Sequence, residues 1–415
     1  MPAGGSPTRG GADVGAHGRR DGRLLPGGHG RGGGQIAGDV SLRVLLDATS
    51  LPPKPAGVGQ YLLGLVHELA ARPDDIELHV AAKKRDLPTL QGRASTAVFH
   101  PVALRSRPAR LLWEQTSLPR LARRAGVRVI HGPHYTLPLR LALPGVVTFH
   151  DPTFFTDPDL HERAKVRYFT RMARLGVARA TRVIAVSEYG RRAAIEHAGA
   201  RADRVDVVHL GVDPARYRPG PEVADEGLRG RLRVDRPYLL WVGTIEPRKD
   251  LPSLVAAFAS LVRERAAQSL VLAGQRGWGA SDLERAIEAS GVAGRIHPLG
   301  YVSEEEKIAL YRGADALVYP SIAEGFGLPV LEAMACGCPV ITTTGSAPEE
   351  IGGEAVELVP PRDPDRLRAA LELVLGNPER RGRLRHAGLE RARGFTWGRT
   401  AEGTLGTYRL AVGSA

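Results

Sequence analysis

Two glutamates, Glu324 and Glu332, are separated by seven residues in an apolar, glycine-rich part of the sequence. The segment Gly-Phe-Gly at 325–327 would let backbone N–H groups approach a ligand closely. Pro329 suits the first turn of a helix, whose positive end would then point at an anion. One carboxylate can accept hydrogen bonds from sugar hydroxyls and the other from a ribose diol. The alternative is a surface helix residue at Glu332 and a helix cap at Glu324.

Two adjacent cations, Arg248 and Lys249, follow an apolar run and Gly243. At a strand-to-helix turn such a pair suits phosphate oxygens, Arg through a planar fork and Lys as a compact charge. A diphosphate leaving group has to be stabilised while its bond breaks, and these two side chains would supply the charge without a metal ion. A solvated basic loop is the alternative.

The elements that must position these residues are short apolar runs, each followed by a helical stretch. Continuous apolar runs are typical of parallel strands covered on both faces. In the first half they occupy 43–46, 76–81, 127–131, 146–150, 183–186 and 205–210, and in the second half 238–242, 270–273, 296–299, 316–319, 340–343 and 355–359. We therefore expect an α/β chain with two doubly wound, Rossmann-like domains facing a ligand-binding cleft.

The domain boundaries follow from changes in composition. Residues 1–40 are rich in Gly and Arg and poor in aliphatic side chains, so they predict a disordered tail. An inert extension, or an upstream start codon wrongly chosen, is favoured over a basic arm that binds an anionic partner. Beyond it we expect a first domain at 41–212, a linker rich in Pro, Arg and Gly at 213–237, a second domain at 238–396 and a terminal helix at 397–415.

The overall composition excludes several classes of protein. The chain has 415 residues, of which 43% are hydrophobic and 25% charged, and this rules out a disordered chain or a collagen-like repeat. Only six of the 57 basic residues are lysines, and such an arginine bias can reflect genomic base composition, so the net charge of +12 does not indicate nucleic acid as a partner. Cys336 and Cys338 are too close for an ordinary disulfide and too few for a zinc site, which favours a reducing cytoplasm.

Positive charge is concentrated in the first half of the chain. Residues 41–215 carry 26 basic and 16 acidic side chains, whereas 216–415 carry 26 of each. The excess gathers at 83–85 and at 105–128, where we expect basic helical turns around Pro119. An anionic membrane surface or a phosphate-bearing acceptor would suit such a face, and a merely solvated face is the alternative. Because no apolar run reaches 18 residues, any membrane contact would be peripheral.

Two acidic motifs match the pattern of metal-dependent sugar transferases, at 157–159 and at 363–365. Each has a proline between its two aspartates, which suits a turn, and we expect no metal site. His131 and His134 share one segment without a third ligand, so lining of an acceptor pocket is favoured over zinc.

Gly57 and Gly59 form only part of a dinucleotide-binding fingerprint. Leu62 stands where that fingerprint has its third glycine, which disfavours a dehydrogenase.

At these spacings and in this order, the segments resemble the retaining nucleotide-sugar glycosyltransferases of family four, which have the GT-B fold. The resemblance covers nearly all of residues 42–410. The Glu324 to Glu332 block matches the family's E-x7-E signature, and Glu-Pro-Arg-Lys at 246–249 is a second, independent match. Three further segments, at 113–115, 131–138 and 150–152, are similar to bacterial mannosyl- and rhamnosyltransferases that build surface polysaccharides.

The resemblance implies a role for each matching residue. Arg248 and Lys249 would hold the donor diphosphate, and Glu332 the ribose. Glu324 would bind the transferred sugar and His150 would face that sugar and the acceptor. With the two cations, Glu324 and His150 complete the implied catalytic set.

The other donor-binding residues implied by the resemblance act through backbone or ring contacts. The 326–328 backbone would bind the sugar, the glycines would pass near the diphosphate, and the 301–302 peptide would lie against the base; these residues are Gly57, Gly59, Gly243, Tyr301, Val302, Phe326, Gly327 and Leu328. The helix beginning at Trp397 would cross back onto the first domain. Asp250 stands where the family often has Asn, a mild departure beside the phosphate site.

The implied activity is retaining, metal-independent hexosyl transfer. We expect mannose from GDP-mannose to reach a glycan or lipid-linked saccharide in cell-surface polysaccharide synthesis, at the cytoplasmic side of the membrane. The same fold using dTDP-rhamnose or a UDP-hexose is one alternative, and an inactive basic binding protein is another. No cofactor besides the donor substrate is expected.

Overall fold

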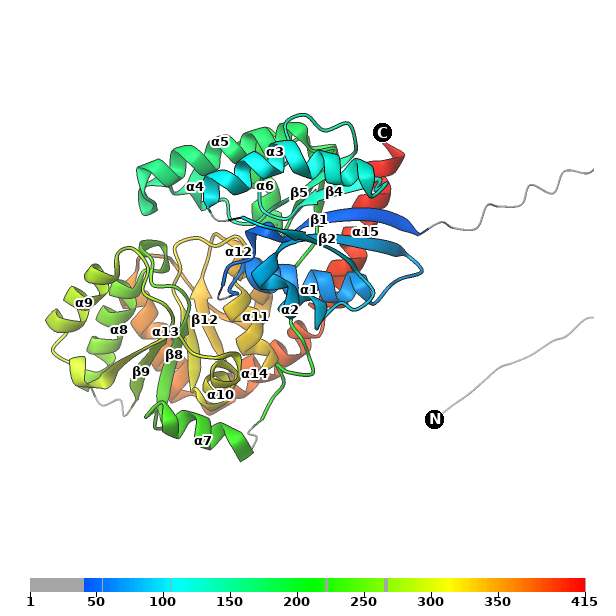
Figure 1. Ribbon diagram of the computed structural model, residues 1–415. Coiled ribbons are helices and arrows are strands. Elements are labelled where there is room, and N and C mark those ends of the chain that lie inside the picture. Colours follow the sequence, from blue (N-terminus) through cyan, green and yellow to red (C-terminus); the bar gives the residue numbers. More distant parts are fainter. Residues whose placement is uncertain (1–40, 54, 105, 221–222, 265–267, 415) are drawn as a thin grey trace, which may run out of the picture. The chain divides into compact units, whose positions relative to one another are not determined.

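The structure is a computed structural model that describes residues 41–414 except 54, 105, 221–222 and 265–267. The predicted disordered tail at 1–40 lies outside the described residues. Two parallel sheets, each flanked by helices, make up the described chain (Figure 1). This confirms the expected fold class of two doubly wound α/β domains.

The first sheet has seven strands in the order β3-β2-β1-β4-β5-β6-β7. All neighbouring strands pair in parallel, and the central strands are buried on both faces, as their continuous apolar sequences require. The strands are β1 Leu42–Asp47, β2 Ile76–Lys83, β3 Val98–Val102, β4 Val129–Gly132, β5 Gly145–Phe149, β6 Arg182–Ala185 and β7 Val205–Val207.

Six α-helices connect these strands. They are α1 Val58–Ala70, α2 Leu87–Gln91, α3 Arg107–Arg124, α4 Thr153–Thr156, α5 Arg163–Arg179 and α6 Glu188–Glu196. Gly57 directly precedes α1 with φ 47° and ψ −107°, a conformation that favours glycine, and so lets the chain turn into the helix.

The second sheet has six parallel strands in the order β10-β9-β8-β11-β12-β13. The strands are β8 Tyr238–Val242, β9 Ser269–Ala273, β10 Ile296–Gly300, β11 Ala316–Tyr319, β12 Val340–Thr343 and β13 Glu357–Val359. The helices are α7 Val223–Arg231, α8 Leu251–Glu264, α9 Ala280–Ala289, α10 Glu304–Gly313, α11 Leu328–Ala335, α12 Ala347–Gly352, α13 Pro364–Gly376 and α14 Pro378–Ala392.

Strand β3 was not among the expected strands. Its sequence, Val-Phe-His-Pro-Val, is short, contains Pro101 and is partly exposed. A proline cannot donate a ladder hydrogen bond and is confined to edge strands or strand ends, and β3 does lie at the edge of its sheet. Continuous apolar runs indicate buried central strands, so they do not reveal this edge strand.

The segment 213–237, expected to be a linker, contains helix α7. The helix packs against α10, where the guanidinium of Arg312 lies 3.3 Å from the carboxylate of Asp225. Both side chains are almost completely buried. Part of the segment expected to be a linker is therefore a helix, anchored partly by a buried ion pair.

Helix α15, Trp397–Gly413, packs on α1 and on strands β4, β5 and β6 of the first sheet. Tyr408 OH lies 2.7 Å from Nδ1 of His131, whose Nε2 lies 2.7 Å from Oγ1 of Thr148. Tyr61 OH contacts the same threonine oxygen at 2.9 Å. This buried polar network joins the C-terminal helix to the first domain.

In the described part of the chain, no helix is both long enough and apolar enough to span a membrane.

Candidate functional site

A cavity of about 370 Å³ is lined by residues that follow strands of both sheets. From the first domain it receives Gly57 after β1 and His150 after β5. From the second it receives Gly243 after β8, Val302 after β10 and Glu324 after β11. The cavity thus lies at the carboxyl ends of the strands, where open parallel sheets bind their ligands.

All but one of the residues predicted to bind or act on the donor line this cavity. The exception is Gly59, where an added Cβ would lie 2.9 Å from Cβ of Pro55. Its missing side chain lets the start of α1 pack against a proline-containing turn. The residues that do line the cavity are Gly57, His150, Gly243, Arg248, Lys249, Tyr301, Val302, Glu324, Phe326, Gly327, Leu328 and Glu332.

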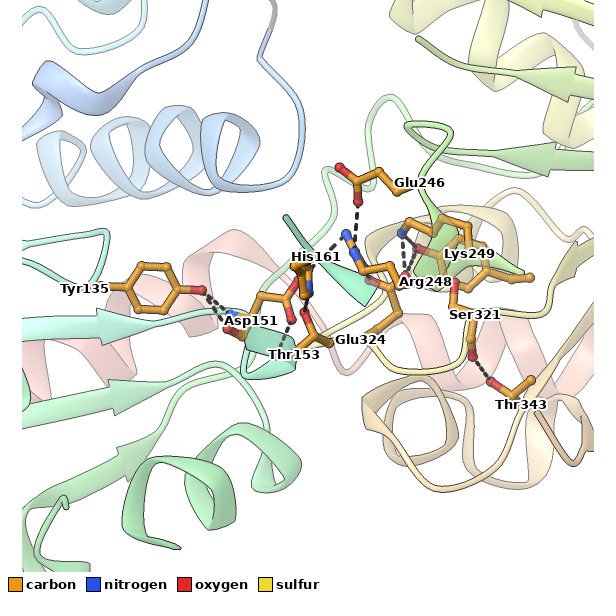
Figure 2. Close-up of polar contacts among 11 residues, drawn as sticks. Tyr135, Asp151, Thr153, His161, Glu246, Arg248, Lys249, Ser321, Glu324 and Thr343 are labelled. Carbon is orange, nitrogen blue, oxygen red and sulfur yellow. Dashed lines mark hydrogen bonds and ion pairs between the residues drawn. The ribbon is translucent and has the colours of Figure 1, made fainter. Parts of the chain in front are cut away.

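Glu324 lies between the two cations (Figure 2). Arg248 Nη1 donates to Glu324 Oε2 at 2.6 Å, and Lys249 Nζ is ion-paired with Oε1. Lys249 also donates to Tyr319 OH at 2.7 Å, and that hydroxyl donates to Glu324 at 3.0 Å. The segments after β8 and β11 are therefore cross-linked by charge-assisted hydrogen bonds that fix both cations.

The ionisation of this cluster follows from burial and from neighbouring charges. Burial favours the neutral acid, but the cations Arg248 and Lys249 lower the pKa of Glu324 to about 2. Burial and the adjacent guanidinium lower the pKa of Lys249, while Glu324 opposes that shift. At neutral pH Glu324 is therefore a carboxylate.

Glu332, on α11, is held by a second set of partners on α10 and on the chain before α7. Lys307 Nζ lies 3.0 Å from Oε1, and Tyr311 OH donates to Oε2 at 2.9 Å. Tyr217 OH donates to Oε1 at 3.2 Å and to Glu304 at 2.6 Å. Burial raises the pKa of Glu332, and Lys307 partly offsets that rise.

The start of α11 brings backbone groups to the cavity. Gly327, with φ 94°, precedes the helix, and Pro329 occupies its first turn. An added Cβ at Gly325 would overlap the carbonyl oxygen of His150, so glycine there permits a close approach between the two domains. The positive end of the helix and the two cations thus border the same cavity.

His150 and Asp151 supply the first-domain wall. His150 Nε2 lies 2.8 Å from Pro133 O, and burial lowers the pKa of this histidine to about 4, so it is neutral at pH 7. Asp151 Oδ2 lies 3.7 Å from Nη2 of Arg248, across the cavity (Figure 2). This ion pair links the predicted phosphate-binding residue to the opposite domain.

His131 and His134, which were expected to line an acceptor pocket, do not line this cavity. His131 is completely buried in its network with Tyr408 and Thr148. The ring of His134 is edge-on to Tyr135, with centroids 4.7 Å apart. His131 therefore serves packing, whereas His134 is only partly buried and its ring centroid lies 6.4 Å from that of His150. Burial lowers the pKa of each to about 3.

Several residues that pair with the cavity's charged side chains were not predicted from sequence: Asp151, Tyr217, Lys307, Tyr311 and Tyr319. The i,i+3 pair Glu304 and Lys307, which is ion-paired at 2.8 Å, was the one local signal for this cluster. Tyr311 and Tyr319 follow apolar residues, and Tyr217 stands between two arginines in the expected linker, so none of the three gave an indication of this role.

Asp250 adopts a left-handed conformation with φ 49° at the end of the turn that carries the cations. Asn and Asp tolerate this conformation better than other non-glycine residues. The Asp250 carboxylate accepts a hydrogen bond from Ser253 Oγ at 2.9 Å. The departure from Asn thus keeps the backbone geometry.

The two Asp-Pro-Asp segments, at 157–159 and 363–365, each have an aspartate that forms a local hydrogen bond. Asp363 caps α13 by accepting from the backbone N–H of Arg366, and Asp157 Oδ2 accepts from Thr156 Oγ1. Within the described ranges, no group of three or more His, Cys, Asp or Glu side chains is placed to hold a metal ion. Cys336 and Cys338 are buried and not disulfide-bonded.

Comparison with known proteins places the chain in a family. Residues 55–216 match the family model Glycosyltransferase Family 4, and residues 229–391 match Glycosyl transferases group 1. The O-antigen chain mannosyltransferase B of Escherichia coli is 33% identical over 368 residues, which cover 85% of this chain and 96% of that protein. The chain belongs to glycosyltransferase family 4. The family resemblance expected from the sequence is therefore confirmed.

One further relative is similar to part of this glycosyltransferase's sequence, and two solved structures are similar to its fold. A D-inositol 3-phosphate glycosyltransferase from Kineococcus radiotolerans is 36% identical over 257 residues, 57% of this chain and 58% of that protein. Sucrose-phosphate synthase from Thermosynechococcus elongatus has a TM-score of 0.74 at 22% identity, over 90% of this chain and 100% of the other. Anabaena HepE, solved with UDP and glucose, has a TM-score of 0.71 at 19% identity, over 89% and 100%. These structural likenesses show the GT-B fold.

Proposed function

We propose that this glycosyltransferase is a retaining hexosyltransferase that moves mannose from GDP-mannose to a glycan or lipid-linked saccharide during cell-surface polysaccharide synthesis. The observation that carries the proposal is the convergence of Arg248, Lys249, Glu324 and Glu332 on one cavity. The choice of mannose is supported by the name of the Escherichia coli relative, which is a mannosyltransferase and is covered along 96% of its length.

In this proposal Arg248, Lys249 and the N-terminus of α11 bind the donor diphosphate, and Glu332 accepts hydrogen bonds from the ribose. Glu324 holds both cations in place and accepts hydrogen bonds from the transferred sugar. The bond between the anomeric carbon and the diphosphate oxygen breaks as the acceptor hydroxyl attacks the same face. A phosphate oxygen takes the acceptor proton, so the products are the glycoside, with its configuration retained, and GDP.

Fixed positive charge is the main catalytic device in this scheme. Charge develops on the diphosphate as its bond breaks, and cations held in place stabilise it without reorganisation. The neutral His150 faces the reacting sugar and helps to position it. Because two side chains supply the charge, we expect the reaction to proceed without a divalent metal ion.

A second part of the proposal concerns the membrane. Helices α3 and α5 both contribute buried side chains to one hydrophobic cluster on the first sheet. Helix α5 has no acidic residue, and the one acidic residue of α3, Glu114, is buried. The exposed basic residues here are Arg120, Arg123, Arg124, Arg163, Lys165, Arg167, Arg171, Arg174 and Arg179. Leu112 on α3, which is 66% exposed, adds an apolar group.

We propose that this basic face of α3 and α5 contacts an anionic membrane at its cytoplasmic side. Clustered Arg and Lys side chains are attracted to anionic lipid headgroups, and exposed apolar side chains enter the interface. Such contact would bring the cavity close to a lipid-linked acceptor.

Thermal-shift titration with nucleoside diphosphates tests the donor assignment. GDP is expected to raise the melting temperature more than UDP or dTDP, with and without EDTA. Stabilisation by UDP or dTDP alone would instead support a UDP-hexose or dTDP-rhamnose donor. Stabilisation by DNA and by no nucleotide would contradict the enzyme function and favour a basic binding protein.

A further inference from the structure

Helix α6 of the first domain begins at a contact with the second domain. Its N-cap residue, Ser187, is completely buried and accepts a hydrogen bond from Gly190 N at 3.0 Å. The same hydroxyl donates to the carbonyl oxygen of Gly325 at 2.7 Å. Ser187 is therefore both a cap of α6 and a partner for the loop that follows Glu324.

Glu350 of α12 completes the cap from the second domain. Its carboxylate accepts hydrogen bonds from the backbone N–H groups of Glu188 at 2.9 Å and Tyr189 at 3.2 Å. The first N–H groups of a helix have no partner inside the helix, and a carboxylate there is favoured by the helix dipole. In most helices such a cap is local, whereas here the carboxylate comes from the other domain.

The same carboxylate contacts the chain that leads into the interdomain segment. His209 Nε2 lies 2.8 Å from Glu350 Oε1, and His209 O accepts a hydrogen bond from Thr400 Oγ1 of α15 at 2.8 Å. Burial opposes ionisation of Glu350, but the hydrogen bonds from His209, Glu188 and Tyr189 lower its pKa. The carboxylate thus joins α12, α6 and the chain held by α15.

These contacts bear directly on the cavity. Gly325 lies between Glu324 and Phe326, both of which line the cavity, and it packs against the carbonyl of His150. The hydrogen bond from Ser187 fixes this loop relative to the first-domain wall. If the domains separated, Ser187, Glu350 and the first turn of α6 would exchange these partners for water. Because water can replace each hydrogen bond, the contact can open and close reversibly.

We propose that Ser187 and Glu350 are positioning residues that latch the two domains in the arrangement where His150 and the 324–328 loop share one cavity. Neither residue lines the cavity, and neither was predicted from the sequence. Loss of the latch lowers the fraction of molecules with an assembled cavity, so donor affinity falls in proportion to that fraction.

The test compares Glu350→Ala and Ser187→Ala with Glu349→Ala in the full chain. Glu349 lies on the same helix, but its carboxylate accepts from Gly345 N at 2.7 Å within the second domain, so its replacement removes a similar charge without touching the latch. Solution X-ray scattering of the ligand-free protein measures domain separation, and calorimetric titration measures the affinity for GDP. Circular dichroism checks that each variant is folded. If Glu350→Ala is unfolded, Glu350→Gln replaces it in both measurements.

Both latch variants are expected to show a larger radius of gyration and about ten-fold weaker GDP binding, whereas Glu349→Ala matches the wild type. The inference rests on the proposed function only for the choice of GDP. If the wild type does not bind GDP while the latch variants still expand, the donor assignment fails and the latch stands. An unchanged radius of gyration in Glu350→Ala and Ser187→Ala would overturn the latch whatever GDP does.

Discussion

The ammonium group of Lys249 is ion-paired with the carboxylate of Glu324, and both groups are almost completely buried. Arg248 lies on the other oxygen of the same carboxylate, at 2.6 Å. Two cations that would repel each other in isolation are thus held together by one anion between them. Arg248 is also ion-paired with Glu246 at 2.9 Å and lies 3.7 Å from Asp151, so carboxylates hold its guanidinium at the cavity between the domains.

The first prediction concerns Lys249→Ala. We expect kcat to fall by about 100-fold or more, because one of the two charges that stabilise the departing diphosphate is lost. The fold should persist, since Glu324 keeps its hydrogen bonds to Arg248 at 2.6 Å and to Tyr319 at 3.0 Å. Steady-state transfer from GDP-mannose and circular dichroism measure the two effects.

The control for this variant is Arg285→Ala. The Arg285 side chain is 74% exposed on α9 and forms only a surface ion pair with Asp282. Its replacement should leave kcat unchanged. Near-normal turnover in a folded Lys249→Ala protein would refute the phosphate-site assignment.

The second prediction is a loss of stability on mild acidification. Burial lowers the pKa of His150 to about 4, below the ordinary value of 6.5. The unfolded chain therefore binds a proton between these two values that the folded chain does not bind. The free energy of unfolding should fall as pH decreases from about 6.5 to 4, by up to about 1.4 kcal/mol per pH unit for this residue.

Urea unfolding at several pH values measures this slope. His131 and His134, whose pKa values are also lowered by burial, contribute in the same direction. The variant His150→Gln should therefore show a smaller slope than the wild type rather than none. An identical slope in both proteins would mean that His150 is not buried in its neutral form.

The third prediction concerns Tyr408→Phe at the C-terminal helix. The change leaves Nδ1 of the completely buried His131 without its partner at 2.7 Å. We expect unfolding to become easier by about 1–3 kcal/mol, the usual effect of an unsatisfied buried polar group.

Leu410→Ala on the same helix is the control, because Leu410 is 51% exposed. Its effect should stay within about 0.5 kcal/mol in the same urea titration. Equal stabilities for Tyr408→Phe and the wild type would show that the network does not hold α15 to the first domain.

The fourth prediction tests the basic face of α3 and α5. The triple variant Arg120→Glu, Arg123→Glu, Arg124→Glu should bind vesicles containing phosphatidylglycerol about 100-fold more weakly than the wild type, since each basic residue near an anionic surface contributes about 1 kcal/mol. Vesicle co-sedimentation at low salt measures the difference, and phosphatidylcholine vesicles should bind neither protein.

A charge-matched triple variant in the second domain is the control. Arg276→Glu, Arg285→Glu, Arg393→Glu changes three side chains that are at least 70% exposed. It should retain most of the vesicle binding. If both triple variants lost the same affinity, net charge rather than the α3 and α5 face would account for the binding.

The sequence predicted the parts of the fold that depend on local pattern. Continuous apolar runs located the buried central strands, because both faces of a parallel sheet are covered. Edge strand β3 was missed because it contains a proline. Helix α7 was missed because its sequence is charged, and the partner of its Asp225, Arg312, lies on α10. Both elements are positioned by neighbours that are distant in the sequence, and composition does not reveal such neighbours.

The cavity shows the same limit. Motif spacing pointed to Arg248, Lys249, Glu324 and Glu332, which the fold brings to one cavity. It did not point to the tyrosines around the glutamates, whose polar role depends on a hydroxyl reaching a buried carboxylate from another element. It also misplaced His131, because a histidine near the end of a strand can equally hydrogen-bond to a distant helix.

A crystal structure of the protein with GDP would show directly whether these residues form the donor site. We expect phosphate oxygens within hydrogen-bond distance of Arg248 and Lys249, and ribose hydroxyls on the carboxylate of Glu332. GDP bound at another surface, with Arg248 and Lys249 contacting no phosphate oxygen, would contradict this expectation.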